Sequence, residues 1–235
     1  MPSLFSLYEY QEFLSPMPDA LTKSSKVAPA KTATRTGSKR EEILDAATQV
    51  FLEYGYEGTS MDRVAAASGA ARRTLYNQFE SKEQLFDAMT ERVWTGFPVL
   101  NITLDEASLS DPHLGLTRLG HAIADFWLPP ESVAFLRMVI SDGPRFPSLT
   151  KTFVDKGKGP AMTAVVDYLQ ALVKRKVLKI KNPLIAGRQF LGLIDEPLLW
   201  VRVVGIDELY TTKEREYIVD SAVEMFLGFY GIKKP

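Results

Sequence analysis

Residues 59 to 85 read TSMDRVAAASGAARRTLYNQFESKEQL, and they predict two short helices joined by a tight turn, with a third helix after them. Thr59 and Ser60 can each offer a side-chain oxygen to the free N–H groups of a first helical turn, so the first helix is predicted to begin near Met61. Gly69 is predicted to end it, because glycine adopts the left-handed conformation at a helix C-terminus without steric penalty. Two short helices with such a turn are typical of a helix-turn-helix, whose second helix enters the major groove of DNA.

The predicted second helix carries two adjacent cations, Arg72 and Arg73, in its first turn. Cations there oppose the helix macrodipole by up to about 1 kcal/mol each, so a compensating negative charge is expected nearby. DNA would supply it, since arginine pairs bidentately with guanine. Asn77 and Gln78 are side-chain types that pair with adenine, and Thr74 can contact a thymine methyl or a phosphate. The alternative is that these residues form the solvated polar face of an exposed helix.

A longer amphipathic helix is predicted ahead of this motif, from about Lys39 to Gly55. Its apolar residues recur at i, i+3, i+4, i+7, i+8 and i+11, and they are Ile43, Ala46, Ala47, Val50, Phe51 and Tyr54. With the two helices of the motif and the helix after them, this segment predicts an N-terminal helix-turn-helix domain over residues 38–95.

From Lys39 to Val93 the chain resembles the DNA-binding domain of the TetR family of bacterial transcriptional regulators. The phrases that carry the resemblance are FLEYGYEGT at residues 51–59 and TLYNQFESKEQLF at residues 74–86. The resemblance implies that phosphates are held by Thr74, Tyr76 and Lys82. It implies that the groove is faced by Arg72, Arg73, Asn77 and Gln78. The predicted DNA-binding set is completed by Thr59 and Ser60.

Two positions depart from the pattern of that family. Members usually have serine where this chain has Ala71, and commonly glycine where it has Arg73. Losing a serine cap costs roughly 1 kcal/mol of helix stability, and Arg73 adds a charge beside the groove. Operator preference therefore does not carry over from relatives.

The basic character of the chain is local, because its formal net charge is −1. Residues 22–40 contain no Asp or Glu, and their basic residues are Lys23, Lys26, Lys31, Arg35, Lys39 and Arg40. Rich in Ser, Thr, Ala and Pro, this stretch is typical of a flexible arm, and residues 1–37 are predicted to form a flexible extension. The arm would follow phosphates or enter a minor groove, and a solvated linker is an equal alternative.

Residues 4–14 form an apolar cluster to which the sequence gives no function. A partner contact, docking on the rest of the chain and an upstream start-codon artefact all stay open. The cluster has no positive region before it and no continuous apolar run, so it is predicted to be neither a signal peptide nor a membrane anchor. The predicted location is cytoplasmic, with no membrane partner.

Residues 96–235 keep helical periodicity and show no run of alternating apolar and polar residues. The fold class of the chain is therefore predicted to be all-α, with about nine helices in total, those of the helix-turn-helix domain included. Helix starts are indicated at Asp111-Pro112 and Asn182-Pro183, where a capping residue precedes proline. Breaks are indicated at Pro129-Pro130 and Gly143-Pro144, and a bend at residues 157–160. This larger domain is expected to bind an effector and to dimerise.

The last two helices are apolar on nearly every side, and Thr212 can cap the second of them. Such helices would expose apolar surface in a monomer. Two from each of two chains would close a four-helix bundle about a two-fold axis, placing two recognition helices about 34 Å apart on a near-palindromic operator. The predicted homodimer interface is formed by Phe190, Leu193, Ile194, Leu198, Val201, Val219, Val223, Phe226, Leu227 and Tyr230.

Residues 135–149, FLRMVISDGPRFPSL, and 186–205, AGRQFLGLIDEPLLWVRVVG, resemble the C-terminal domain of the AefR-like subgroup of that family. The resemblance implies an effector pocket within the helical body and pairing of the last two helices between subunits. Candidate pocket residues are Trp94, Phe97, His121, Phe126, Trp127, Arg137, Met138 and Tyr168, each with a place in the ordinary core as the alternative. Arg137 is expected to pair with Asp142 or an anionic ligand, and the predicted effector is small and mostly apolar.

Other classes of function find little support. The chain has no cysteine, two histidines, and no GxSxG, HExxH, GxGxxG or phosphate-loop motif, so no catalytic residue, metal site or cofactor is predicted. Asp195 and Glu196 would point about 100° apart on a helix, and Pro197 is interpreted as a kink. The sequence thus predicts a dimeric, sequence-specific transcriptional repressor released from double-stranded DNA by a small effector. The alternative is a DNA-organising or division-linked DNA-binding protein.

Overall fold

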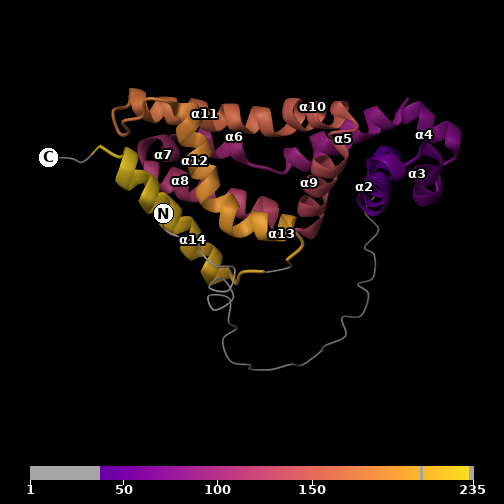
Figure 1. Cartoon of the computed structure of the whole chain (residues 1–235). Coiled ribbons are helices and arrows are strands. Elements are labelled where there is room, and N and C mark those ends of the chain that lie inside the picture. Colours follow the sequence, from indigo (N-terminus) through magenta and orange to yellow (C-terminus); the bar gives the residue numbers. More distant parts are fainter. Residues whose placement is uncertain (1–37, 207–208, 233–235) are drawn as a thin grey trace, which may run out of the picture. The chain divides into compact units, whose positions relative to one another are not determined.

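The computed structural model describes residues 38–206 and 209–232, and Figure 1 shows their helices. The all-α prediction is confirmed, and pairing of extended backbone in these residues is limited to one isolated bridge between Leu178 and Gly231. No helix of this part of the chain is long and apolar enough to cross a membrane. The predicted N-terminal extension of residues 1–37, with all of its basic arm except Lys39 and Arg40, lies outside the described residues.

The first four helices are α2 (Lys39–Gly58), α3 (Met61–Ser68), α4 (Arg72–Gln78) and α5 (Lys82–Thr95). The ends of α3 agree with the prediction, whereas α2 runs on to Gly58 past its predicted end at Gly55. Helical backbone in α2 is broken at Gly55, which has φ 70° and ψ 177°. Ser60 caps α3 by accepting a hydrogen bond from the Arg63 N–H, and Gly69 ends α3 in the left-handed conformation at φ 60°.

The buried core of these helices continues into the helices that follow. The largest fully buried side chains of α2 to α5 include Phe51, Leu75 and Phe86. The same cluster takes in Phe135 and Leu149, which come from beyond the expected boundary at residue 95, because α2 and α5 pack against α9 and α10. The division at residues 95 and 96 therefore stays a prediction, and the two expected domains share one hydrophobic cluster.

The remaining helices are α6 (Val99–Thr103), α7 (Glu106–Ser110), α8 (Pro112–Trp127), α9 (Pro130–Asp142), α10 (Pro147–Phe153), α11 (Gly159–Lys174), α12 (Pro183–Asp195), α13 (Val201–Val203) and α14 (Thr212–Tyr230). Asp111 and Asn182 cap α8 and α12 as predicted. The cap of α14 is Thr211 and not Thr212, because Thr211 and Glu214 form a reciprocal capping box. The five-residue α6 and α7 were not expected, since so short a helix shows no periodicity.

Two wider π turns, η1 (Val154–Lys158) and η2 (Glu196–Trp200), join neighbouring helices. They fall where the sequence predicts a bend and a kink. Pro160 and Pro197 have no N–H to donate to a helical carbonyl, which disturbs the regular hydrogen-bond ladder there. As a result α10 continues through η1 into α11, and α12 continues through η2 into α13.

A second cluster of buried side chains lies between α8, α11, α12 and α14. Leu119, Leu169, Phe190 and Val223 are each fully buried in it. Because these residues fill the space between four helices, the C-terminal part of the chain has a hydrophobic core of its own. We call residues 96–232 the body.

Candidate DNA-binding face and ligand pocket

Helix α4 presents a polar outer face, as predicted. Leu75 is buried beneath it, whereas Arg72, Arg73, Asn77 and Gln78 are exposed. Tyr76 lies on the same side and is 39% exposed. The residue types that read bases and hold phosphates are thus all exposed on one short helix.

The two arginines of α4 have different surroundings. Its cap position, Ala71, makes no side-chain hydrogen bond, so the first turn lacks the usual cap. The Arg72 Nε lies 3.1 Å from an Asp62 carboxylate oxygen on α3. Among the described residues no carboxylate oxygen lies within 4 Å of the Arg73 guanidinium. Asp62 therefore compensates Arg72 without DNA, which the sequence analysis missed, and Arg73 is the cation that remains open to a partner.

Two residues of the predicted DNA-binding set serve the protein's own packing. Thr59 is 3% exposed and its hydroxyl donates to the Gly55 carbonyl at 2.7 Å, so this prediction needs correction: the side chain has no surface for DNA. Lys82 is half-buried, and its amine donates to the Tyr56 carbonyl at 2.9 Å. Ser60 is exposed, with its hydroxyl oxygen at the α3 cap.

A hydrogen-bonded contact joins the last turn of α2, just after the break at Gly55, to the end of α9. The Tyr56 backbone N–H donates to Asp142 Oδ2 at 2.8 Å, and Asp142 is buried. Arg145 contacts the other Asp142 oxygen at 3.2 Å and Glu57 at 2.6 Å. The Tyr56 hydroxyl donates to Glu83 at 3.0 Å; burial, with the help of Glu83, raises the pKa of this phenol above its usual value. The periodicity of α9 gave no signal for this role of Asp142.

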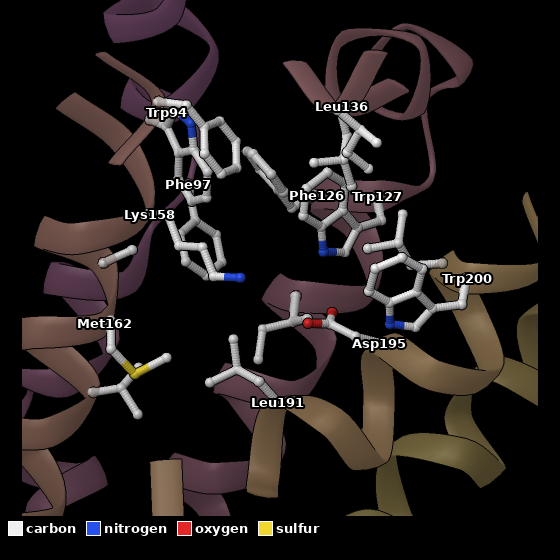
Figure 2. A pocket seen from close by; sticks show the side chains of 16 residues that line it. Trp94, Phe97, Phe126, Trp127, Leu136, Lys158, Met162, Leu191, Asp195 and Trp200 are labelled. Carbon is white, nitrogen blue, oxygen red and sulfur yellow. The ribbon is translucent and has the colours of Figure 1, made fainter. Parts of the chain in front are cut away.

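A cavity of about 260 Å³ opens among α5, α8, α9, α11 and α12 (Figure 2). Its walls are mostly aromatic and aliphatic. Trp94 and Phe126 face each other with ring centroids 4.8 Å apart, and Gly157 in η1 lies against the Trp94 indole, where a larger side chain would collide. The lining residues are Trp94, Phe97, Ile123, Phe126, Trp127, Leu136, Ile140, Phe153, Lys158, Ala161, Met162, Val165, Leu191, Asp195, Leu199 and Trp200.

The cavity brings together four of the eight predicted pocket residues, which are Trp94, Phe97, Phe126 and Trp127. The other four lie elsewhere, and three have clear reasons. Arg137 donates to the Val203 carbonyl at 3.0 Å and to the Arg202 carbonyl at the end of α13, so it does not pair with Asp142. Met138 belongs to the core shared with α2 to α5. Tyr168 is buried, with its hydroxyl donating to the Ser108 carbonyl at 2.8 Å. His121, on α8, is half-buried outside the lining.

The charged residues on the cavity wall are Lys158 and Asp195, and neither was among the predicted pocket residues. Figure 2 shows the Lys158 amine and the Asp195 carboxyl directed into the cavity from different sides. Burial raises the pKa of the Asp195 carboxyl to about 6, against the opposing influence of Lys158 and of the Trp127 indole. Asp195 Oδ1 has no hydrogen-bond partner among the described residues, and neither does the Trp94 indole N–H. Glu196, next in sequence, is exposed, so the two carboxylates do point apart.

Most of the predicted dimer-interface residues are buried within the protomer. These are Phe190, Ile194, Leu198, Val219, Val223 and Phe226, and they pack in the body core. Leu193, Val201, Leu227 and Tyr230 are half-buried. The exposed face of the same two helices is different: on α12 it includes Ile185 and Gly192, and on α14 it includes Tyr217, Met225, Gly228 and Phe229. We call these six residues the α12–α14 stripe. Because both helices carry apolar residues on nearly every side, the sequence pattern could not distinguish the face that packs in the core from the face that is exposed.

Comparison with known proteins identifies two family domains in this chain. Residues 43–89 match the family of bacterial regulatory proteins of the tetR type, and residues 114–232 match the C-terminal domain of AefR-like transcriptional repressors. A solved TetR family transcriptional regulator from Pseudomonas syringae pv. tomato is 30% identical with a TM-score of 0.68, covering 85% of this chain and 100% of that one. The solved flavonoid-responsive regulator FrrA is 28% identical with a TM-score of 0.67, covering 83% and 98%.

Curated relatives match over shorter stretches. The transcriptional repressor NicS of Pseudomonas putida is 32% identical over 46% of this chain and 49% of its own length. The first of the curated relatives are matched over about a quarter to a half of their length. The AefR-like match alone spans half of the chain, and the solved relatives extend the likeness through both halves. The chain therefore belongs to the TetR family of bacterial transcriptional regulators and carries an AefR-like C-terminal domain.

Proposed function

We propose that this chain is a homodimeric transcriptional repressor that binds a near-palindromic operator and leaves it when a small, mostly apolar ligand occupies the cavity. The observation that carries the proposal is the position of α5. Three residues separate it from the end of α4, and Trp94 in its last turn forms part of the cavity wall. A single helix therefore links a polar recognition face to a ligand-sized space.

The outer face of α4 supports DNA recognition. Arg73 has an uncompensated charge beside the amides Asn77 and Gln78, and Tyr76 can donate to a phosphate from the same surface. The Asp62 carboxylate would have to release Arg72 before that guanidinium could reach a base. We therefore expect Arg73 to contribute more to binding than Arg72.

Contacts along α5 support a mechanical link between cavity and DNA-binding face. The Thr152 hydroxyl donates to Asp87 at 2.6 Å, and Lys156 in η1 pairs with Glu91 at 2.7 Å. A ligand that displaces Trp94 or η1 would shift α5 and, with it, the distance between the two recognition helices of a dimer. A hundredfold loss of operator affinity requires about 2.7 kcal/mol of coupling between the two sites.

The dimer is proposed from the exposed residues of α12 and α14, whereas repression and the class of effector are proposed chiefly from similar proteins. An α12–α14 stripe of exposed apolar residues suits a four-helix dimer interface, with Gly192 and Gly228 allowing close approach. The name of NicS as a repressor favours repression. The description of FrrA as flavonoid-responsive favours an aromatic effector, as does the aromatic cavity wall.

Substitutions on the α4 face test the DNA-binding part of this proposal. Arg73→Ala and Gln78→Ala should each cost about 1–3 kcal/mol on the best site and relax base preference at one position per half-site. Tyr76→Phe should weaken binding to all sequences alike, because it removes a phosphate contact. Lys181→Ala, an exposed cation of the body, is the control and should change nothing. Gel shifts on a panel of single-base operator variants measure both effects; equal losses for all three α4 variants on every sequence would contradict the assigned roles.

A further inference from the structure

All three tryptophans of the chain lie on the wall of one cavity. Trp94 comes from α5, Trp127 from α8 and Trp200 from η2, so helices distant in sequence converge there. Phe97 and Phe126 join them, with ring centroids 5.2 Å apart. Flat aromatic walls favour a flat aromatic ligand, because rings attract one another in stacked and edge-on arrangements. The cavity has a volume of about 260 Å³, which is small for a ligand pocket and limits the ligand to a small molecule.

The cavity also holds an unmatched polar atom that defines what the ligand must offer. Asp195 Oδ1 is a buried acceptor without a partner among the described residues, so it requires a donor. The Trp94 indole N–H is also buried without a partner among the described residues, but it lies against Gly157 in η1 and so makes no demand on a ligand. Buried polar groups in native proteins are nearly always hydrogen-bonded, which makes the unpaired Asp195 oxygen a specific demand on the cavity's occupant.

The charges on the wall restrict the ligand further. A ligand carboxylate could reach Lys158, which is exposed at the edge of the cavity, but it would bring a second negative charge near the Asp195 carboxylate. A ligand ammonium could reach Asp195 but would meet the charge of Lys158. A purely apolar ligand would exclude water from Asp195 and leave Oδ1 unpaired. A neutral hydroxyl avoids all three penalties, since it donates through hydrogen and accepts through oxygen (Figure 2).

We propose that the cavity selects a planar, hydroxylated aromatic compound of two or three rings, whose hydroxyl donates to the Asp195 carboxylate and whose oxygen accepts from Lys158. The inference rests on the proposed function, since it names the chemical class of the ligand for the same cavity. Asp195 is then the residue that determines specificity, and the tryptophans provide affinity for the rings.

Matched probes of one ring system test this selectivity. Purified full-length protein is titrated calorimetrically with naphthol, naphthalene and naphthoate at mildly alkaline pH, where the Asp195 carboxyl is ionised. Naphthol is expected to bind at least about tenfold more tightly than either of the others, as a hydrogen bond to a charged group permits. The Asp195→Leu variant should bind naphthol no better than naphthalene, and Asp195→Asn should fall in between.

The neighbouring residue offers a control for the Asp195 variants. Glu196 is exposed and does not line the cavity, so Glu196→Leu should keep the full preference for naphthol. Thermal unfolding of each variant shows that it folds. The proposal is overturned if naphthoate binds most tightly, if the three probes bind equally or not at all, or if the preference for naphthol persists in Asp195→Leu.

Gel shifts with the same samples separate this inference from the proposed function. If naphthol binds as expected but leaves the operator complex intact, the proposed ligand class is supported, and the proposed release of the protein from DNA by ligand is contradicted. If naphthoate binds most tightly and dissociates the operator complex, ligand release holds and the ligand class fails.

Discussion

Replacement of Gly228 by glutamate is expected to convert the proposed dimer into a monomer and to lower operator affinity by about 100-fold or more, equivalent to about 2.7 kcal/mol. Gly228 lies on the exposed stripe of α14, and a Cβ atom there would meet no atom of the described protomer within 4 Å. The protomer should therefore fold as before, with a gain in helix propensity of up to about 1 kcal/mol from losing glycine. In a dimer, the same side chain would bury a charge in the interface.

Sedimentation velocity and gel shifts measure the two consequences of this substitution. Lys174→Glu is the control, because it places the same side chain at an exposed position of α11, outside the two helices of the stripe. Gly192→Glu on α12 should behave like Gly228→Glu, since Gly192 is equally open. If Gly228→Glu stays dimeric with unchanged operator affinity, the stripe is not the subunit interface.

The Gly55→Ala variant is expected to lower the free energy of unfolding by about 2–4 kcal/mol. Gly55 has φ 70° and ψ 177°, a conformation that belongs essentially to glycine. A Cβ atom would also lie 3.1 Å from Asp142 Oδ2, which accepts the Tyr56 N–H at 2.8 Å. The substitution therefore strains the backbone and loosens the contact between the last turn of α2 and the end of α9.

Gly96→Ala gives the matched comparison for Gly55. Gly96 has φ −72°, and the nearest atom to an added Cβ is 3.7 Å away, an ordinary contact. Its effect should lie within about 0.5 kcal/mol, on the stabilising side if the lower entropy of the unfolded chain dominates. Urea unfolding of both variants provides the measurement, and a Gly55→Ala protein as stable as Gly96→Ala would contradict this account of the turn.

The N-terminal helices could be predicted because single residues mark their ends. Ser60 and Gly69 act through bonds and backbone angles within a few residues of themselves, and so does Gly55. Effects that act over so few residues can be predicted from the sequence. The exposed set on α4 was predictable for a related reason, since Leu75 alone of its central residues had to be buried.

The cavity could be predicted only in part. Apolar residues of α8 and α11 have the same spacing whether they face the core or the cavity. Tyr168 and Phe126 were therefore predicted to line one pocket, although only Phe126 lines the cavity and Tyr168 is buried in the core. Lys158 lies in the π turn η1, where side chains no longer follow the spacing of a regular α-helix. Asp195 is the last residue of α12, directly before η2, and helical periodicity does not show that this carboxyl faces a cavity. Arg137 was misjudged because its partners are backbone carbonyls of α13, and these have no sequence signature.

The most direct test of the central claim is sequencing of the genomic DNA fragments that the purified full-length protein retains at moderate salt. The account predicts a small number of near-palindromic sites, each with half-sites about 34 Å apart, and their release when the cavity ligand is added. Retention without sequence preference would contradict it, and so would many scattered sites that no ligand releases.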